Sequence, residues 1–272
     1  MGLPEEDLFS ISEIYHENTK ERAMVLPLLG NVPRERGPWH RAFKKYPHRN
    51  AIRLEKPVPG PSPGFEETAR RRRSIRDFSG DPISLDELAR LLYFSNGITG
   101  SLQSGDSLIP LRASPSAGAL YPIEVYPFVA AVSGIEQGVY HYEVEGHALE
   151  HLRSGSFSED LYEYTHRQEM VRKSSVVFVM TAMFGRTKVK YGERGYRYVL
   201  LDAGHLAQNL YLESTALGLG CATVGGFLDD EVNGLLGVDG LLESAVYVAV
   251  VGRPVGPCQC AEGPGEIAER QV

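Results

Sequence analysis

Two long helices stand out in the spacing of apolar residues along the chain. Ser84-Leu85-Asp86-Glu87 is a capping box, in which the serine hydroxyl accepts the glutamate amide hydrogen and the glutamate reaches back to the serine. Leucines then recur at helical spacing until Asn96-Gly97, which ends the helix. A second run of leucine, valine and alanine predicts a helix over 196–217, with Gly218 as its C-cap.

The other apolar segments are short and are typical of strands. They cover 123–132, 138–144, 148–152, 175–183, 221–224 and 245–251, with Glu145-Gly146 as a hairpin turn. A short helix is expected from Phe65 into a group of arginines, whereas residues 99–119 lack regular periodicity and are expected to form a loop rich in glycine and serine. Because helices and strands alternate without a strict strand–helix–parallel-strand repeat, the expected fold class is α+β.

The two ends of the chain differ from its middle. Residues 1–63 show little periodicity and end in a proline-rich run, and a segment with so few aliphatic residues seldom folds alone. We therefore expect 1–63 to be an N-terminal extension wrapped on the main body. The main domain is expected over 64–256, and residues 257–272 are expected to form a flexible C-terminal tail.

Composition excludes several classes of protein. Of 272 residues, 42% are apolar and 23% are charged, which is typical of a globular protein. Nothing approaches the roughly 18 uninterrupted apolar residues of a membrane helix, and the N-terminus has no apolar signal core, so we expect a cytoplasmic protein with no membrane partner. Three cysteines are too few for a disulfide framework. No histidine pair has zinc-site spacing, and Cys258 and Cys260 on a tail rich in glycine and proline are expected to be inert, so no metal is predicted.

The charge is unevenly distributed. The chain carries −7 overall, yet five arginines fall within seven positions, at 70–73 and 76. The acidic remainder argues against nucleic acid but leaves room for a local anion site. Cations in the last turn of a helix, or on a solvated face, are the simpler explanation. The run continues as Ser74-Ile75-Arg76, however, and guanidinium forks with a hydroxyl suit a phosphomonoester.

Two other motifs are weak. Gly218-Leu219-Gly220 follows a predicted helix, and Thr223 stands where a dinucleotide-binding fingerprint needs its third glycine. Gly105-Asp106-Ser107-Leu108, with Asp202 and His205 downstream, matches the blocks of GDSL-type esterases. The serine does not follow a strand, and i, i+3 residues share a helix face for ordinary packing reasons, so the esterase hypothesis is disfavoured.

A larger set of motifs carries a family resemblance. Residues 72–78 (RRSIRDF) resemble the N-terminal FMN-binding signature of the nitroreductase superfamily, and within it the SagB/McbC-type dehydrogenases, which are azoline oxidase-like. Further marks, in order, are 114–124, 190–198, 201–205 and 218–220, with Tyr15-His16 and Thr19-Lys20 in the extension, so the resemblance covers about residues 12–255. It implies the nitroreductase fold: a central, mostly antiparallel sheet flanked by helices, in a domain-entwined homodimer.

The resemblance also implies an FMN site. In this family the residues matched by Arg72, Arg73, Ser74 and Arg76 hold the flavin phosphate, ribityl chain and pyrimidine edge, and Arg253 matches a C-terminal phosphate-binding arginine. Pro115, Ser116, Ala117 and Ala119 match a loop that reaches the flavin from the other subunit. Gly225 and Gly226 match backbone that approaches the hydride-accepting N5. Many ordinary nitroreductases carry Glu at Gly225 and Asn and Gln at Ala119 and Tyr121, which disfavours nicotinamide-driven nitro reduction.

Lys190 and Tyr191 resemble the catalytic pair of the azoline-oxidising branch. Aromatising a thiazoline or oxazoline removes a hydride to flavin and a proton from the adjacent carbon, and a lysine can take that proton. The alternative is that Lys188 and Lys190 form the wet face of a loop. The leading hypothesis is dehydrogenation of azolines in a modified peptide, beside a cyclodehydratase. An NAD(P)H-dependent nitro or flavin reductase and a non-catalytic flavin-binding scaffold remain open.

Overall fold

The computed structural model describes residues 10–20, 43–58, 60, 63–105 and 107–256. The predicted tail at 257–272, with Cys258 and Cys260, lies outside the described residues, as do Asp106 of the esterase-like motif and much of the predicted extension.

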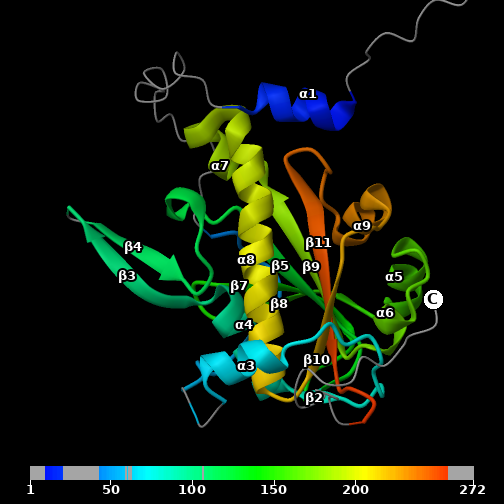
Figure 1. Ribbon diagram of the computed structural model, residues 1–272. Helices are drawn as coiled ribbons and strands as arrows, with labels where there is room; N and C mark the ends of the chain where they lie inside the picture. The colour runs from blue at the N-terminus through cyan, green and yellow to red at the C-terminus, as the bar shows by residue number, and fades with distance from the viewer. Residues whose placement is uncertain (1–9, 21–42, 59, 61–62, 106, 257–272) are drawn as a thin grey trace, which may run out of the picture.

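A seven-stranded antiparallel sheet forms the centre of the molecule (Figure 1). Its order is β1 (Ala51–Arg53), β8 (Ala148–Ser154), β7 (Gly138–Glu143), β5 (Ile123–Val129), β9 (Val176–Met183), β11 (Glu243–Gly252) and β10 (Gly220–Val224). Alternate residues of each strand face opposite sides, so both faces need a cover. On β5, Val125 packs in one apolar cluster and Tyr126 in the other.

Helices cover both faces of the sheet. One cluster contains apolar residues of α4 (Leu85–Asn96) and the long α8 (Gly195–Ala216), which crosses the front of the sheet in Figure 1. The other cluster contains residues of α5 (Ser158–Tyr164), α6 (Glu169–Lys173) and α9 (Asp229–Leu236). The predicted α+β class with a central antiparallel sheet flanked by helices is confirmed.

The strongest local predictions are also confirmed. The capping box at Ser84 has both of its hydrogen bonds, from Glu87 N to Ser84 Oγ at 3.1 Å and from Ser84 N to Glu87 Oε2 at 2.7 Å. The short helix α3 (Phe65–Arg71) runs into the arginines as expected. The predicted strand over 123–132 is divided, because β5 ends at Val129 and a two-residue strand β6 (Val132–Ser133) pairs with β2 (Ile83–Ser84).

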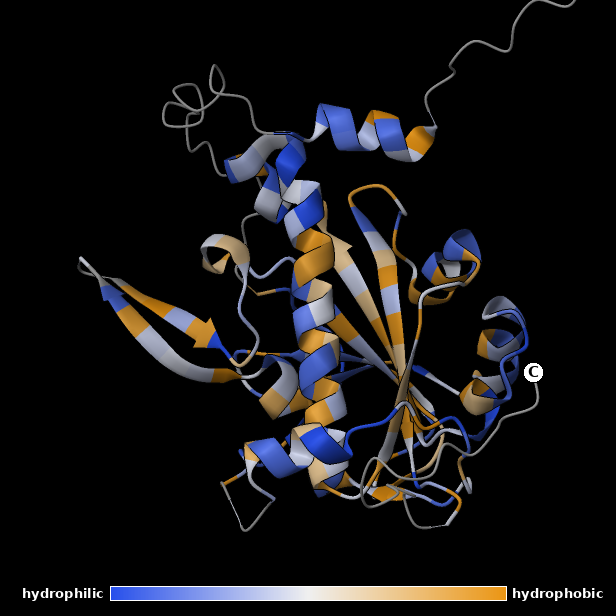
Figure 2. Ribbon diagram, in the orientation of Figure 1, coloured by the Kyte–Doolittle hydropathy of each residue, from blue (hydrophilic) through white to orange (hydrophobic). Residues whose placement is uncertain are grey.

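The expectation of a loop over 99–119 is wrong for its first half. Residues there form a hairpin of β3 (Ile98–Ser104) and β4 (Ser107–Arg112), which pair only with each other within the described residues. The hairpin projects from the body (Figure 1), and Leu102 and Leu108 are 56% and 67% exposed. Because the hairpin packs on the core only at its base, where Ile98 contacts the cluster, the sequence beyond the base lacks the alternation that burial imposes elsewhere (Figure 2).

The segment after β9 is helical. α7 (Phe184–Tyr191) begins directly after that strand and carries Lys188, Lys190 and Tyr191 in its second half. A short 3₁₀ turn, η3 (Gly192–Arg194), then leads into α8. The two lysines therefore lie on a helix and not on a loop, and Lys190 is exposed there.

Part of the predicted extension contacts the main body. Helix α1 (Ile11–Asn18) lies across the end of α8 near α7 (Figure 1). Arg197 of α8 donates from Nη2 to the His16 carbonyl at 2.7 Å and from Nε to Thr19 Oγ1 at 2.6 Å, and the Tyr15 ring packs edge-on against Tyr196. Arg194 Nη1 also donates to the Thr19 carbonyl at 3.2 Å, so two arginines bond groups at the C-terminal end of α1 through three donors.

Among the described residues, none of the helices combines the length and the apolar character that spanning a bilayer requires.

Candidate functional site

The segment after α3 brings the predicted phosphate-binding arginines to one end of the sheet. Ile75 N donates to the Cys221 carbonyl of β10 at 2.9 Å, which fixes the segment along that edge strand. Further on, Ser79 N donates to the Arg253 carbonyl at 2.9 Å, and Phe78 pairs with Pro254. The structure therefore places Arg76 and Arg253, which are far apart in the sequence, on neighbouring backbone segments.

Three cationic side chains of this end are accessible. Arg73 and Arg76 are exposed, and Arg73 Nη1 donates to the backbone carbonyls of Arg70 and Arg72. Arg253 Nη2 donates to Glu87 Oε2 at 2.8 Å, so that the carboxylate that closes the capping box also holds this guanidinium. Its remaining N–H groups leave donors for an anion.

Arg72 and Ser74 face inward instead, toward α8. The Arg72 guanidinium lies over the Tyr211 ring, 5.4 Å from its centroid, and Ser74 Oγ is 3.0 Å from the Tyr211 hydroxyl. The same hydroxyl accepts from Thr223 N at 3.0 Å, and Thr223 Oγ1 accepts from the Tyr247 hydroxyl at 2.8 Å. A chain of hydroxyls thus ties the arginine segment to α8, β10 and β11.

Gly225 and Gly226 follow the end of β10 as exposed backbone. A β-carbon added to Gly225 would meet nothing within 4 Å, so the space beside this backbone is open to a flat ligand. A β-carbon on Gly226 would lie 3.6 Å from the His166 ring, which is ordinary contact. The pair therefore fits the predicted close approach of backbone to a ring system.

The loop of residues 114–121 is held from α8. Ser116 Oγ donates to Asp202 Oδ2 at 2.6 Å, and Ala117 N donates to Asp202 Oδ1 at 3.4 Å. Tyr121 N in turn donates to Ser116 Oγ at 2.9 Å. Burial raises the pKa of the Asp202 carboxyl, and its hydrogen bonds from the loop oppose that rise. Asp202 is engaged with this loop, which places it outside the esterase-like arrangement.

The backbone of this loop is strained in a way that few side chains tolerate. Gly118, Ala119 and Tyr121 all adopt positive φ, at +63°, +53° and +46°. Tyr121 is fixed further by Arg112, whose backbone N donates to the Tyr121 hydroxyl at 3.0 Å and whose guanidinium lies 4.8 Å from the ring centroid. Non-glycine residues at positive φ cluster at functional sites, where the surrounding contacts hold them.

Lys190 and Tyr191 converge on this loop. A β-carbon built on Gly118 would lie 2.7 Å from the Tyr191 hydroxyl and 2.8 Å from Lys190 Nζ. The amine also lies 5.2 Å from the Tyr191 ring centroid, and that ring packs edge-on against Tyr198. The structure therefore joins the predicted catalytic pair to the predicted cofactor loop, with an amine and a phenol side by side over glycine backbone.

The two halves of the predicted site, the 114–121 loop and the arginine segment, contact different positions along α8. The 114–121 loop contacts Asp202, and the arginine segment contacts Tyr211, nine residues later. At 1.5 Å per residue these contacts are about 14 Å apart along the helix. Within one subunit, the structure therefore brings Pro115, Ser116, Ala117 and Ala119 near Lys190 and Tyr191, and does not bring them to Arg72–Arg76, Arg253 and the glycine pair.

The donor set fits FMN. Arginine forks and a serine hydroxyl bind a phosphate and polar ring edges, and open glycine backbone accommodates a flat ring. Among the described residues no group of acidic, histidine and cysteine side chains could hold a metal ion. Burial raises the pKa of the Cys221 thiol to about 12, so this cysteine is not a nucleophile at neutral pH.

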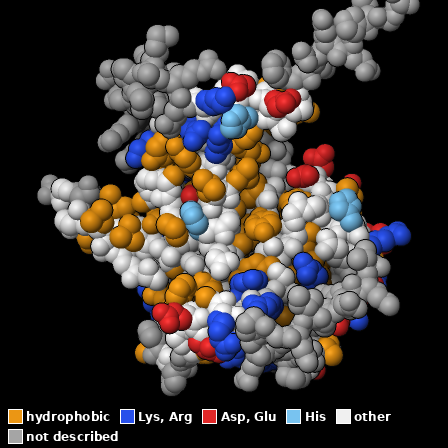
Figure 3. Space-filling view, viewed as in Figure 1, with side chains coloured by type: hydrophobic (Ala, Val, Ile, Leu, Met, Phe, Trp, Pro, Cys, Tyr) orange, Lys and Arg blue, Asp and Glu red, His pale blue; other side chains and the backbone are white. Residues whose placement is uncertain are grey.

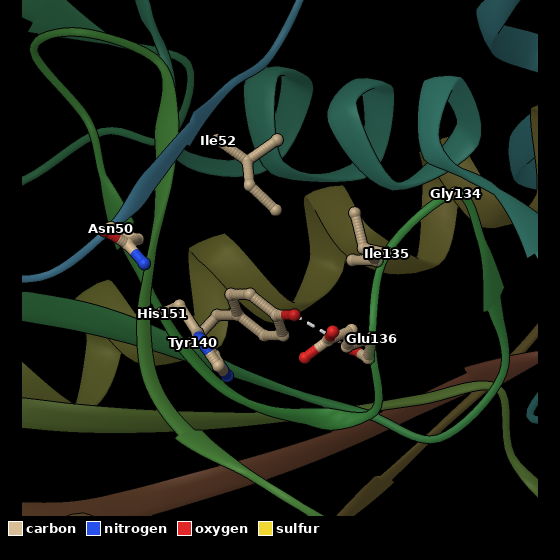
Figure 4. A pocket seen from close by; sticks show the side chains of 7 residues that line it. All are labelled: Asn50, Ile52, Gly134, Ile135, Glu136, Tyr140 and His151. Atoms are coloured by element: carbon tan, nitrogen blue, oxygen red, sulfur yellow. Dashed lines mark hydrogen bonds between the residues drawn. The ribbon is translucent and has the colours of Figure 1, made fainter.

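A surface hollow lies apart from these residues. It has a volume of about 610 Å³ and is lined by Asn50, Ile52, Gly134, Ile135, Glu136, Tyr140 and His151 (Figure 4). The Tyr140 hydroxyl donates to the Glu136 carbonyl across its floor. None of the predicted site residues lines it.

Sequence reasoning missed three residues that shape the site. Glu87 was recognised only as a helix cap, although it also holds Arg253. Asp202 and Gly118 lie within motifs that carried the resemblance, but their contacts to Ser116 and to Tyr191 join segments far apart in the chain. Of the three, Gly118 alone carried a local signal for such a contact, since a glycine between larger residues often marks a close approach of another segment.

Comparison with known proteins decides the family. The profile of the nitroreductase family matches residues 69–253. The chain belongs to the nitroreductase family. The resemblance to the SagB/McbC-type members of that superfamily is likewise confirmed, because the relatives include two proteins named for trifolitoxin and microcin B17 processing.

Three curated relatives are similar to this nitroreductase over more than half of its length. MJ1384 of Methanocaldococcus jannaschii, named as a nitroreductase, is 35% identical over 70% of this chain and 91% of its own length. The trifolitoxin-processing protein TfxB of Rhizobium leguminosarum bv. trifolii is 34% identical over 63% of this chain and 48% of its own. The microcin B17-processing protein McbC of Escherichia coli is 32% identical over 58% and 57%. The chain thus spans about half the length of both processing proteins.

A solved structure agrees on the fold. The crystal structure of a nitroreductase homologue from Anabaena variabilis superposes with a TM-score of 0.72 at 29% identity, covering 97% of this chain and 52% of that one.

Proposed function

We propose that this nitroreductase is an FMN-dependent dehydrogenase that oxidises thiazoline or oxazoline rings of a modified peptide to azoles. The observation that carries the proposal is the convergence of Lys190 Nζ and the Tyr191 hydroxyl on Gly118. The names of TfxB and McbC, both processing proteins for peptide products, support a peptide as the substrate.

When bound, FMN supplies a two-electron acceptor for the hydride that leaves the azoline ring. Lys190 Nζ takes the proton from the adjacent ring carbon, and the electron pair of that C–H bond forms the new ring double bond. The Tyr191 hydroxyl, beside the same glycine, orients the ring and the amine. Loss of one hydride and one proton balances the change from azoline to azole.

The cofactor would be held by two parts of the chain. Arg73, Arg76 and Arg253 bind the phosphate, and Glu87 orients the last of these. Arg72 and Ser74 serve the ribityl chain and the polar edge of the ring. The exposed backbone of Gly225 and Gly226 would lie beside the flavin ring.

A homodimer would complete the site. The 114–121 loop and the arginine segment lie about 14 Å apart along α8, so a symmetric pairing of two copies can bring the loop of one to the arginines of the other. Leu200 and Leu201, on the same helix, are 42% and 58% exposed. Hydrophobic side chains gather along α8 and over the β3–β4 hairpin in Figure 3, as an interface between copies requires.

A cyclodehydratase is the expected partner, because an azoline must be formed before it can be oxidised. The fold of this chain also matches a chain in the Escherichia coli microcin synthetase McbBCD complex, with a TM-score of 0.56 at 22% identity. That likeness concerns the fold alone, so the partner is inferred from the chemistry and from the processing relatives.

The proposal is tested by incubating the purified yellow protein with a peptide that contains one thiazoline ring. We expect a product lighter by two hydrogen atoms, with the azole absorbance band, and we expect a Lys190→Ala/Tyr191→Phe protein to retain flavin and lose this turnover. Equal turnover by the double variant would exclude the pair as catalytic residues.

A small-molecule reductase is the second candidate, and the 35% identity to MJ1384 over 91% of that protein favours it. Addition of NADH or NADPH without oxygen separates the two. Rapid bleaching of the flavin, followed by reduction of a nitroaromatic compound, supports the reductase. A flavin that neither nicotinamide bleaches, in a protein that oxidises the azoline peptide, supports the dehydrogenase. A flavin that is reduced neither by a nicotinamide nor by the azoline peptide indicates a non-catalytic scaffold.

A further inference from the structure

Arg186 is a buried arginine that no predicted site contains. It lies in the first turn of α7, and its side chain is only 2% exposed. Its Nη1 donates to the Tyr121 carbonyl at 2.9 Å and lies 2.5 Å from Glu124 Oε1. Lys190 follows one helical turn later on the same helix. The Arg186 side chain therefore links the 114–121 loop to the helix that carries the catalytic pair.

A chain of buried polar side chains holds Glu124, the ion-pair partner of this arginine. Glu124 Oε2 is 3.0 Å from His141 Nε2, and His141 Nδ1 is 2.7 Å from Glu150 Oε2. Glu150 Oε1 then accepts from the Tyr46 amide at 2.8 Å. Burial opposes ionisation of Glu124, yet Arg186 and His141 beside it lower its pKa to about 2. Glu124 is therefore charged at neutral pH and gives Arg186 a fixed anchor on β5.

This arrangement is poorly suited to stabilising the fold. Arg186 Nε and Nη2 are buried and have no hydrogen-bond partner within the described part of the chain. Unpaired buried donors cost free energy, and a buried ion pair often contributes no more than apolar residues of the same volume. An apolar residue would fill the site at less cost but would not hold the Tyr121 carbonyl.

We propose that Arg186 is a positioning residue for the proposed reaction. It fixes the 114–121 loop and the α7 helix in one register, so that Lys190 Nζ and the Tyr191 hydroxyl stay over Gly118. Arg186 does this through one nitrogen, Nη1, which donates to the Tyr121 carbonyl at 2.9 Å and forms an ion pair with Glu124 Oε1 at 2.5 Å. The inference rests on the proposed function and adds a residue to it.

The test shortens the side chain by one atom and keeps the charge. In Arg186→Lys the ammonium that pairs with Glu124 falls short of the position that Nη1 occupies beside the Tyr121 carbonyl. We expect kcat for the azoline peptide to fall about 10²-fold, since small misplacements of reacting groups cost this much. The FMN dissociation constant should change by less than about threefold. The arginine segment that would bind the FMN phosphate contacts α8 at Tyr211, whereas Arg186 contacts the 114–121 loop. Arg90→Lys is the matched control, since Arg90 pairs with Glu213 at 3.0 Å between α4 and α8. An equal loss in both variants would overturn the inference.

A second measurement separates positioning from folding. If Arg186 acts through the catalytic pair, Arg186→Lys in a Lys190→Ala background should lower the residual kcat by only about twofold, whereas independent effects would multiply. Multiplicative losses would contradict the inference. If Arg186→Lys fails to fold, Glu124→Gln removes the same anchor with little change of shape and is put through the same cycle.

Amide hydrogen exchange of the protein without flavin gives a readout that needs no turnover. We expect Arg186→Lys to speed exchange about tenfold or more at 116–121 and 188–192, and to leave β9 and the Arg90→Lys protein unchanged. If the wild-type protein oxidises no azoline, the proposed function fails, and this exchange pattern still decides whether Arg186 locks the loop to α7. Unchanged exchange at both segments would overturn the inference on its own.

Discussion

The Tyr191 hydroxyl lies 2.7 Å from the point that a β-carbon on Gly118 would occupy, so the tyrosine keeps this position only beside a glycine. Lys190 Nζ lies 2.8 Å from the same point. An alanine at 118 would displace both groups, because each is the far end of a flexible side chain and gives way before the backbone does.

We therefore expect Gly118→Ala to lower azoline turnover about tenfold or more while the fold persists. Its φ of +63° adds about 1–2 kcal/mol of backbone strain. Gly237→Ala is the control, because Gly237 has φ +69° and open space around it, far along the chain at the end of α9. Thermal denaturation should show similar losses in both variants, and similar turnover in both would contradict the role given to Gly118.

Separate replacement of Lys190 and Tyr191 should divide their roles. Lys190→Ala removes the group that takes the proton, and we expect kcat to fall about 10²- to 10⁴-fold. Tyr191→Phe removes only the hydroxyl and should cost less. Flavin absorbance at constant protein concentration verifies that both variants keep the cofactor. A Lys190→Ala protein with wild-type kcat would show that the proton goes elsewhere.

Arg253 offers a test of how the cofactor is held. We expect Arg253→Ala to weaken FMN binding about tenfold or more and to leave riboflavin binding unchanged, because riboflavin has no phosphate. Arg70→Ala serves as the control, since Arg70 pairs with Glu67 on α3 and is exposed. Flavin fluorescence titration measures both ligands. Parallel weakening of FMN and riboflavin would mean that Arg253 does not contact the phosphate.

His147 should make the fold sensitive to mild acid. It is buried with φ +50°, its Nδ1 is 2.7 Å from the Tyr142 hydroxyl, and burial lowers its pKa to about 4 from an ordinary value near 6.5. Between those values the unfolded chain binds the proton and the folded chain does not, so the free energy of unfolding falls as pH drops from 6.5 to 4.

The loss over that range should exceed about 1 kcal/mol in urea denaturation. His147→Asn keeps a residue that tolerates positive φ and removes the titrating ring, so its stability should depend less on pH across this window. If the two proteins lose stability in parallel, another group is responsible.

The elements that the sequence predicted are those that burial dictates. α4 and α8 bury a regular stripe of aliphatic residues, and β5, β9 and β11 lie in the core, so their patterns are unambiguous. β1 has only three residues, and the second half of α7 is largely polar because it carries the site. The β3–β4 hairpin packs on the core only at its base, through Ile98, so the hydrophobic pattern does not predict its strands.

The site was predictable as a set of residues and unpredictable as a set of contacts. The ordered motifs named Lys190, Tyr191 and the 114–121 loop, but their meeting at Gly118 depends on how α7 leaves β9. The pairing of Glu87 with Arg253 depends on the end of β11 reaching the first turn of α4. Such contacts join distant segments, and a single sequence does not encode them in any local pattern.

We expect the exposure of the projecting β3–β4 hairpin to depend on protein concentration. A hairpin of two strands is marginal in water without a surface to cover it, and β3 and β4 find none in their own chain among the described residues. Leu102 and Leu108 are 56% and 67% exposed, and the proposed homodimer would shield them. If the chain forms that homodimer, dilution below its dissociation constant should open the hairpin to proteases, so that cleavage near Gly105 measures the fraction of monomer.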